Sequence, residues 1–531
     1  MTPIRVDEAV PEHPPTIWSL IEQRAEDTPD GPMLFDDRDR SLTFARFKAA
    51  ALRTAAGLHA LGVHEASKVS WQLPTVLESA VLLAALSRLG VVQNPLVPIL
   101  RRRDVGFIVE QTGADFLIVP GLWRSFDYEA MAKEVATETG CQVLVTGHPD
   151  LSTDGSLALP SGDPATLPPL PPPPTGPGDL PVRWIFYSSG TTGVPKGACH
   201  TDASLMAGPN GMLARLDMGP DDRYPVVFPF THIGGVCVMT FALETRCPLI
   251  LLETFDMSKS PVWLAGQNPT FLGSTVPFFH AYLDAQRRFG TDPLYPKLRA
   301  LLGGGAPKPP DLHTEVQEVL PGCRGILSSW GLTEFPMATY CSTDDTDEQL
   351  AHTEGRLVPG VELRVISFEG DECGPGVEGE LRLRGPQLFR GYLDASLNAD
   401  ALDEQGYFRT GDLGIVGPEG HVRITGRMKD VIIRNAENIS AREVEEVLFG
   451  YDKIRDVAVI GVPDPKTGER CCAVVELTDP QDTLTLAELA DFCRATGLTT
   501  QKIPERLELV TDMPRNAMGK IAKQELRSRF R

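Results

Sequence analysis

The sequence predicts an α/β protein: a large N-terminal domain of parallel α/β sheets plus a small antiparallel β unit, with a small mobile α+β C-terminal domain. Three observations predict this class. At 531 residues the chain is too long for one hydrophobic core. Short apolar runs alternate with helix-length segments in the N-terminal half, and strands of alternating polarity follow only later. We place the two domains at residues 1–427 and 428–531.

The parallel sheets are predicted from apolar runs of strand length. Residues 115–120, 141–146, 184–186 and 248–253 are predicted to be buried strands, and the nearly all-apolar segment 81–86 is predicted to be a buried helix. Buried strands with intervening helices are typical of parallel α/β sheets.

Proline dominates residues 159–180 and occupies all of positions 171–174. Such a composition predicts an extended surface linker in place of a helix or strand. Because the segment falls immediately before the predicted strand at 184–186, we interpret it as an external connection between two subdomains of the N-terminal domain.

Alternating residues at 379–384 and 414–425 predict the antiparallel unit. The C-terminal domain is predicted to begin near Arg427, and Ser440 and Glu443 fit a capping box at the start of a helix. Its further predicted elements are strands at 457–462 and 472–477 and a helix with the apolar stripe Leu486, Leu489, Ala490 and Cys493, which stops near Gly497.

Composition excludes several classes of partner. The chain is 42% hydrophobic and 23% charged, as soluble globular proteins are. A net charge of −21 argues against nucleic acid and against anionic membrane surfaces. No apolar run reaches the roughly 18 residues of an integral membrane segment, and no signal peptide is expected. The ten cysteines are scattered without metal-type spacing, which predicts reduced thiols and a cytoplasmic location.

The segment 187–197 carries the strongest functional signal. It holds three glycines, four Ser or Thr side chains and Lys196 in eleven residues. Glycine lets successive backbone N–H groups point at one place, and the lysine adds positive charge, so the segment predicts a cradle for a polyphosphate. A flexible surface loop is the alternative. The pattern is not a Walker A sequence, because proline precedes Lys196 and glycine follows it.

Five further motifs follow in order, at 303–307, 328–334, 407–412, 426–430 and 514–520. With the segment 187–197 they resemble the adenylate-forming (AMP-binding) superfamily of acyl-CoA synthetases, peptide-synthetase adenylation domains and beetle luciferases. Each also has a plainer reading. The glycine run is also typical of a strand-to-helix turn, and the motif at 328–334 is also consistent with a core tryptophan beside a solvated glutamate.

The resemblance implies that ATP and Mg²⁺ bind along these motifs. Trp330 would stack on the base, Asp412 would accept hydrogen bonds from the ribose hydroxyls, and Glu334 with Thr192 would ligate Mg²⁺. Lys520, Thr192 and Glu334 are the implied catalytic residues, and Lys429 is the implied hinge of the C-terminal domain. The implied ATP or AMP site comprises Ser188, Ser189, Gly190, Thr191, Thr192, Gly193, Lys196, Gly304, Gly305, Ala306, Pro307, Ser329, Trp330, Gly331, Thr333, Asp412, Arg427 and Lys520.

The resemblance also implies an acyl pocket and a thiol channel. Phe228, His232 and Gly305 would line the pocket, although a lone histidine in an apolar stretch is more often a core residue. Asn435, Ala436 and Glu437 would line the coenzyme A channel. The family often has paired glycines there, and the methyl group of Ala436 narrows the channel.

The function implied is that of an acyl-CoA synthetase. ATP would activate a hydrophobic monocarboxylic acid to an acyl-adenylate, and coenzyme A would then take the acyl group after the C-terminal domain pivots at Lys429. Alternatives are a stand-alone enzyme that loads a carrier-protein thiol and a non-catalytic nucleotide-binding regulator. The acid itself stays open between medium-chain, alicyclic, aromatic and steroid-side-chain acids, and so does the oligomeric state, a homodimer included.

Overall fold

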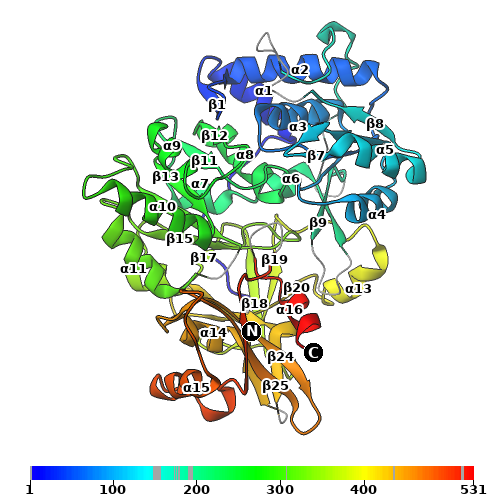
Figure 1. The fold of residues 1–531 in the computed structure, drawn as a ribbon. Helices are drawn as coiled ribbons and strands as arrows, with labels where there is room; N and C mark the ends of the chain where they lie inside the picture. Colours follow the sequence, from blue (N-terminus) through cyan, green and yellow to red (C-terminus); the bar gives the residue numbers. More distant parts are fainter. Residues whose placement is uncertain are drawn as a thin grey trace.

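The computed structural model describes residues 3–147, 157–172, 174, 176, 180–188, 195–305, 308–434, 437–515 and 520–531. It is a mixed α/β structure in which parallel sheets and helices form a large N-terminal part, and residues 431–531 form a smaller part beneath it (Figure 1). This confirms the predicted fold class. The predicted boundary between residues 427 and 428 stays a prediction.

The first sheet has six strands in the order β10-β9-β4-β3-β5-β8. All neighbours are parallel except the pair β9 and β10. The strands are β3 (Lys68–Trp71), β4 (Val92–Pro95), β5 (Phe116–Val119), β8 (Gln142–Val145), β9 (Trp184–Ser188) and β10 (Lys196–His200), and a separate two-stranded hairpin joins β6 (Leu122–Trp123) to β7 (Phe126–Asp127). The helices of this region are α1 (Ile17–Asp27), α2 (Phe44–Ala60), α3 (Leu77–Leu89), α4 (Arg102–Thr112) and α5 (Tyr128–Thr139). The buried strands predicted at 115–120 and 184–186 and the buried helix at 81–86 are thereby confirmed. The strand predicted at 141–146 forms as β8, but its predicted burial is wrong, because β8 is an edge strand whose Gln142 and Val145 are exposed.

The proline-rich segment does not join two subdomains, and that prediction is wrong. It leads from β8, at one edge of the first sheet, to β9, which pairs with β4 in the same sheet. Its described part contains a short 3-10 helix, η2 (Pro164–Thr166). Backbone hydrogen bonds tie it to α2, because Gly162 N donates to Arg53 O at 2.9 Å. The described part of the segment therefore contacts α2, one of the helices of this region.

Two further sheets complete the parallel region. The second sheet has the order β11-β12-β1-β2, and the third sheet has the order β13-β14-β15-β16-β17. The strands are β1 (Pro32–Asp36), β2 (Ser41–Thr43), β11 (Tyr224–Val226), β12 (Leu249–Leu251), β13 (Phe271–Ser274), β14 (Ala300–Gly304), β15 (Ile326–Trp330), β16 (Thr339–Tyr340) and β17 (Arg356–Leu357). The helices are α6 (Asp202–Met206), α7 (Asn210–Arg215), α8 (Ile233–Thr245), α9 (Ser260–Gly266), α10 (Val276–Phe289), α11 (Pro310–Val319) and α12 (Asp347–His352). The strand predicted at 248–253 is β12.

The antiparallel unit is also confirmed. It contains β18 (Glu362–Ile366), β19 (Gly379–Arg384), β20 (Phe408–Val416) and β21 (Val422–Arg427), with the short helix α13 (Asn398–Ala401) beside it. The register pairs Asp412 on β20 with Arg427 on β21. Two residues that are fifteen positions apart in sequence are thus brought side by side.

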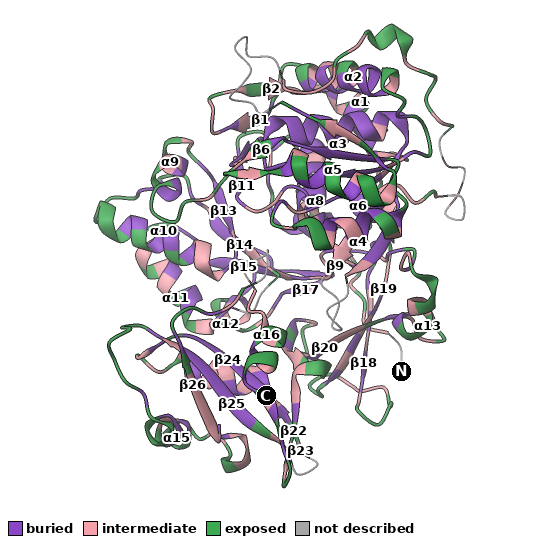
Figure 2. Cartoon of the chain, turned by 45° about the vertical axis from the view of Figure 1, so that its right-hand side comes forward, coloured by how far each residue is buried: buried purple, intermediate pink, exposed green. Residues whose placement is uncertain are grey.

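The C-terminal part has a core of its own, with Val444, Val459 and Val475 fully buried in it. Its elements are β22 (Val431–Arg434), β23 (Glu437–Ser440), α14 (Ala441–Phe449), β24 (Ile454–Asp464), β25 (Gly468–Leu477), α15 (Leu486–Ala495), β26 (Arg506–Val510) and α16 (Lys523–Arg529). Figure 2 shows the buried strands β24 and β25 behind the more exposed α16.

The capping box at α14 is only half formed. Ser440 Oγ accepts a hydrogen bond from Glu443 N at 3.3 Å, as predicted. The carboxylate of Glu443, however, accepts hydrogen bonds from Lys502 Nζ at 2.6 and 2.7 Å. The charged amine provides a stronger partner for this carboxylate than the neutral N–H of residue 440.

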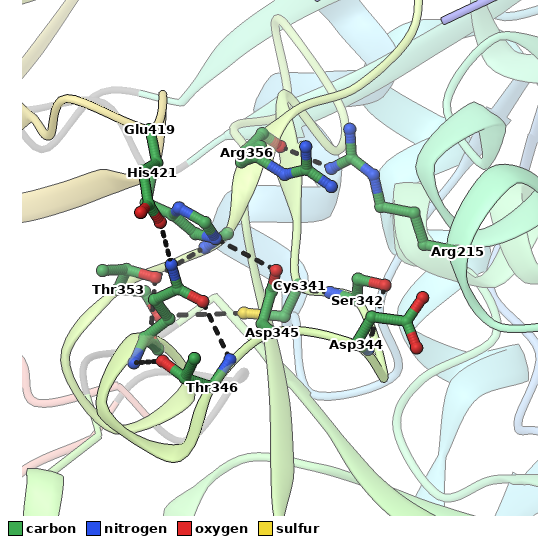
Figure 3. A network of polar contacts seen from close by, with 12 residues as sticks. Arg215, Cys341, Ser342, Asp344, Asp345, Thr346, Thr353, Arg356, Glu419 and His421 are labelled. Atoms are coloured by element: carbon green, nitrogen blue, oxygen red, sulfur yellow. Dashed lines mark hydrogen bonds and ion pairs between the residues drawn. The ribbon is translucent and has the colours of Figure 1, made fainter.

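A buried polar junction fixes the antiparallel unit against the third sheet (Figure 3). Arg215, at the end of α7, donates to Tyr340 O at 2.7 Å and to Arg356 O at 2.8 Å. At the turn between β20 and β21, His421 Nε2 lies 3.0 Å from Asp345 Oδ1. Buried polar groups that have found partners are costly to separate. Arg215 therefore holds α7 against β16 and β17, and His421 holds the β20–β21 turn against the segment that follows β16.

Candidate active site

The predicted phosphate loop, the glycine run and the motif at 328–334 each lie at the end of a strand. Strands β14 and β15 are parallel, so the residues after Gly304 and after Trp330 lie at the same edge of the third sheet. On the first sheet, Ser188 and Lys196 are paired across β9 and β10 at the two ends of the predicted phosphate loop. Carboxyl ends of parallel strands are where ligands bind in open α/β sheets.

Several predicted residues lie outside the described residues, and their assignments stay predictions. These are Ser189, Gly190, Thr191, Thr192 and Gly193 of the phosphate loop, Ala306 and Pro307, and Asn435 and Ala436 of the channel. Glu437 begins β23.

Glu334 joins the phosphate loop to the third sheet. Its carboxylate oxygen Oε1 accepts a hydrogen bond from Ser188 Oγ at 3.1 Å and another from the hydroxyl of Tyr392 at 2.8 Å. Glu334 is 7% exposed. Among the residues that the structure describes, no hydrogen-bond donor reaches Oε2. A buried carboxylate with one oriented oxygen, next to the phosphate loop, fits a hard cation such as Mg²⁺.

Tyr392 is a site residue that the sequence analysis missed. Its hydroxyl contacts Glu334, and Lys196 Nζ lies 5.3 Å from the centroid of its ring, within the range of a cation–π contact. Its backbone N–H donates to Asn398 Oδ1 at 2.7 Å. Burial, and then the charge of Glu334, raise the pKa of its hydroxyl, which therefore stays a donor. In the sequence Tyr392 follows Gly391, and such a pair is too common to predict a role in the site.

His200 contacts the backbone of the segment that carries Glu334. Its Nε2 lies 2.8 Å from the carbonyl oxygen of Thr333, the residue before Glu334. Burial lowers the pKa of His200 to about 4, so the ring is neutral and donates to this carbonyl through Nε2. The structure thus orients the Thr333–Glu334 backbone through a buried histidine.

The glycine run is partly explained by packing. A Cβ atom on Gly304 would lie 2.6 Å from Ser329 Oγ on the neighbouring strand, so a larger residue would displace this hydroxyl, which donates a hydrogen bond to Gly303 O. Gly305 has a φ of 76°, in the left-handed region that favours glycine. Both residues are therefore needed by the turn as well as by the predicted nucleotide contact. Gly331 follows the end of β15 directly.

The structure brings together three predicted residues from three strands. Trp330 Nε1 donates a hydrogen bond to Asp412 Oδ2 at 2.8 Å, and Arg427 Nε lies 2.8 Å from Asp412 Oδ1. Asp412 is 3% exposed. The carboxylate predicted to bind ribose is therefore oriented by a donor on each oxygen.

Lys520 reaches the same place from the C-terminal part. A Cβ atom on Gly305 would lie 3.7 Å from Lys520 Cε and 4.0 Å from Nζ. Burial lowers the pKa of Lys520 to about 8, and the nearby charges of Arg427 and Lys429 act in the same direction while Asp412 opposes them. Of the two domain arrangements expected from a pivot at Lys429, the structure therefore has the one in which Lys520 lies inside the site.

Phe228 and His232 lie next to each other at the start of α8. A Cβ atom on Gly234 would lie 3.2 Å from His232 Nδ1 and 3.5 Å from the Phe228 ring. His232 caps the helix, because its Nδ1 accepts a hydrogen bond from Gly234 N at 3.1 Å. Burial, followed by the charge of Lys520, lowers the pKa of His232 to about 4. The histidine is thus both a helix cap and a neutral neighbour of Lys520.

Lys429 lies in the short 3-10 helix η5 (Met428–Asp430) between β21 and β22. Next to it, Asp430 accepts a hydrogen bond from Arg527 Nη2 on α16 at 2.6 Å. One contact across the predicted hinge is the hydrogen bond from Ser440 Oγ to Thr425 O at 2.8 Å. If the chain pivots here, the contacts that change among the described residues include this hydrogen bond and the ion pair between Arg423 and Glu446.

The chain matches two family descriptions. Residues 21–393 match the AMP-binding enzyme family, and residues 443–520 match the AMP-binding enzyme C-terminal domain. A medium-chain fatty-acid–CoA ligase of Escherichia coli is 31% identical over 519 residues, which cover 95% of this chain and 89% of the relative. A salicyl-AMP ligase / salicyl-S-ArCP synthetase of Mycobacterium tuberculosis is 32% identical over 531 residues, covering 96% and 90%.

Solved structures agree over nearly the whole length. ATP-bound MatB from Rhodopseudomonas palustris superposes with a TM-score of 0.84 at 27% identity, covering 97% of this chain and 99% of that one. The o-succinylbenzoate coenzyme A synthetase MenE from Bacillus subtilis, in complex with ATP and magnesium, gives a TM-score of 0.81 at 25% identity, covering 96% and 98%.

Proposed function

The chain belongs to the AMP-binding enzyme family, and from this membership we propose that it joins a hydrophobic monocarboxylic acid to coenzyme A by way of an acyl-adenylate. It is an adenylate-forming acid–thiol ligase that releases AMP. The observation that carries the proposal is the position of Lys520. A buried lysine from the last residues of the chain lies beside Gly305 and Asp412, where an anionic substrate needs positive charge.

ATP is the proposed adenylyl donor, and the two solved structures described above contain it. Ser188 and Lys196 would hold its phosphates, Trp330 its base and Asp412 its ribose. Glu334 would bind Mg²⁺, which neutralises phosphate charge during transfer. A carboxylate oxygen is a ligand that suits this ion, and the hydroxyls of Ser188 and Tyr392 orient the Glu334 carboxylate through Oε1.

The proposed reaction has two steps. A carboxylate oxygen of the acid attacks the α-phosphorus of ATP, forming the mixed anhydride while pyrophosphate leaves with the electrons of the broken P–O bond. Lys520 stabilises the charge on the oxygens that surround the transferring phosphorus. The sulfur of coenzyme A then attacks the acyl carbon, the bond from that carbon to the phosphate oxygen breaks, AMP leaves with its electrons, and the thiol proton passes to solvent. We propose residues 1–427 and 428–531 as the two domains, with Lys429 as the pivot between the steps.

The proposed acid has one carboxylate, and the rest of the molecule is apolar and uncharged. Phe228 is apolar, and His232 is neutral at physiological pH, so neither would pair with a second carboxylate. The relative named a medium-chain fatty-acid–CoA ligase supports an aliphatic acid. Relatives named for salicylate and for a naphthoate make aromatic acids the second class to test.

A carrier-protein thiol is the second candidate acceptor. The Mycobacterium tuberculosis relative is named as a salicyl-S-ArCP synthetase, and Ala436 stands where the family often has a channel glycine.

All ten cysteines are free thiols, nine of them buried, which supports our proposal of a reducing, cytoplasmic location. Among the described residues, none of the helices combines the length and apolar character that crossing a bilayer requires.

The test is a panel of carboxylic acids assayed for pyrophosphate release and for thioester formation. We expect acid-dependent pyrophosphate release with Mg·ATP, and thioester formation when coenzyme A is added. Pyrophosphate release without a coenzyme A thioester, but with loading of a phosphopantetheinylated carrier protein, would favour the second candidate. No acid-dependent pyrophosphate release with any acid, from protein that binds AMP, would favour the non-catalytic regulator.

A further inference from the structure

Trp330 carries a hydrogen bond that base stacking does not require. Its indole N–H donates to Asp412 Oδ2 at 2.8 Å. Both residues are nearly inaccessible to solvent, with Trp330 7% exposed and Asp412 3% exposed. A buried hydrogen bond to a carboxylate is charge-assisted, and its loss leaves a buried acceptor without its donor.

Trp330 and Arg427, which both contact the Asp412 carboxylate, differ in their position in the fold and in their exposure to solvent. Trp330 ends β15 inside the N-terminal part, whereas Arg427 ends β21 directly before the predicted hinge. The Arg427 side chain is 43% exposed, and its contact with Oδ1 is an ion pair at 2.8 Å. The indole contact is therefore the buried one, and the arginine contact lies where the chain is expected to pivot.

We propose that Trp330 is a positioning residue, which holds the Asp412 carboxylate in the orientation that receives the ribose hydroxyls while Arg427 changes place. This rests on the proposed function, in which Asp412 binds ribose. A carboxylate oxygen has more than one acceptor site, so a hydroxyl can donate to Asp412 while the indole stays bound. Phenylalanine would keep a ring for stacking but lose the donor.

The experiment measures ribose recognition directly, by calorimetric binding of AMP, 2′-deoxy-AMP and 3′-deoxy-AMP. In the unmodified protein we expect AMP to bind about tenfold or more tighter than the weaker of the two deoxy analogues, as loss of a hydrogen bond to a charged group predicts. Trp330→Phe should reduce this preference to about threefold or less. Asp412→Asn should also remove it, and the double variant should add nothing further.

A matched control separates ring truncation from loss of the donor. Trp18, on α1, is also buried, and its indole N–H has no hydrogen-bond partner among the described residues. Trp18→Phe should leave the ribose preference unchanged, and its loss of stability in thermal unfolding measures the effect of the smaller ring alone. If Trp330→Phe does not fold, Trp330→Tyr serves, because it keeps a large ring and removes the N–H from its present position.

The outcomes distinguish this inference from the proposed function. If Trp330→Phe weakens AMP and both deoxy analogues by the same factor, the tryptophan acts by stacking alone and the inference is overturned. If the unmodified protein binds AMP without any ribose preference, the inference also falls. If it binds neither AMP nor ATP, the proposed function and the inference fall together.

Discussion

The hydroxyl of Tyr392 donates a 2.8 Å hydrogen bond to Oε1 of Glu334, the carboxylate proposed to bind Mg²⁺. The same oxygen accepts a hydrogen bond from Ser188 at the edge of the phosphate loop. Two donors on one oxygen fix the plane of the carboxylate and direct Oε2 to a single side. The tyrosine thus acts on the metal site through a residue more than fifty positions away in sequence.

Replacing Tyr392 by phenylalanine should weaken the use of Mg²⁺ without removing it. Loss of a residue that orients a metal ligand predicts a rise of about 10-fold to 100-fold in the Mg²⁺ concentration for half-maximal pyrophosphate release. The measurement is pyrophosphate release at saturating ATP over a Mg²⁺ titration. An unchanged titration curve would show that the hydroxyl does not orient the metal ligand.

Glu334→Gln should have a larger effect than the tyrosine variant. Losing a direct metal ligand is expected to slow adenylation by one or more orders of magnitude, or about 2–4 kcal/mol of transition-state stabilisation. Circular dichroism and thermal unfolding check that the fold is kept. Normal turnover at limiting Mg²⁺ would remove Glu334 from the metal site.

Phe228 and His232 should shape the choice of acid. Changing an apolar pocket by about one methylene alters discrimination by about 1–3 kcal/mol, so each alanine variant should shift the preferred acid in a substrate panel. His232→Ala also removes the cap of α8, and His232→Asn is the control that can still cap. Identical preference profiles in the alanine variants and the unmodified protein would assign His232 a purely structural role.

The pH dependence of adenylation should report Lys520. Its pKa is lowered to about 8 by burial, so the charged form is present below that pH and is lost above it. The rate constant kcat/KM for ATP, which reports the free enzyme, should therefore fall as pH rises through about 8. Lys520→Arg keeps its charge in this range, and its profile should stay level there. If kcat/KM for ATP falls with the same midpoint in the unmodified protein and in Lys520→Arg, the group that titrates is not Lys520.

The two proposed steps should separate in two variants. Lys520→Ala should fail to form acyl-adenylate from acid and ATP, yet convert supplied acyl-adenylate and coenzyme A to thioester. Lys429→Pro, which restricts φ at the proposed hinge, should retain pyrophosphate release and lose thioester formation. Rapid-quench assays of each step measure both. Equal loss of both steps in both folded variants would contradict a mechanism with two domain arrangements.

The elements predicted correctly share strong local signals. The wholly apolar segment 81–86 and the strand β5 have no polar residue to compete with burial, so their structure follows from composition and length. The linker prediction failed for a different reason. A proline-rich composition indicates an extended chain, but it says nothing about which strands the two ends of that chain join.

The same limit applied to the partners of single side chains. Glu443 has a local pattern typical of a capping box, yet its carboxylate is bound by Lys502 from a distant turn. Tyr392 had no local pattern at all. Both outcomes depend on charges and hydroxyls that meet only after the sheets have packed.

The sequence by itself determined the family, the fold class and the order of the motifs, because glycine spacing, apolar runs and the lysine near the C-terminus are local and specific. Only the tertiary structure decided which side chains meet: Tyr392 with Glu334, Trp330 with Asp412, and Lys520 with the segment at Gly305. The physical reason is that hydrogen bonds and ion pairs depend on distances of a few ångströms between atoms on different strands. Those distances are set by sheet register and by buried junctions such as His421 with Asp345, which no single segment of the sequence encodes.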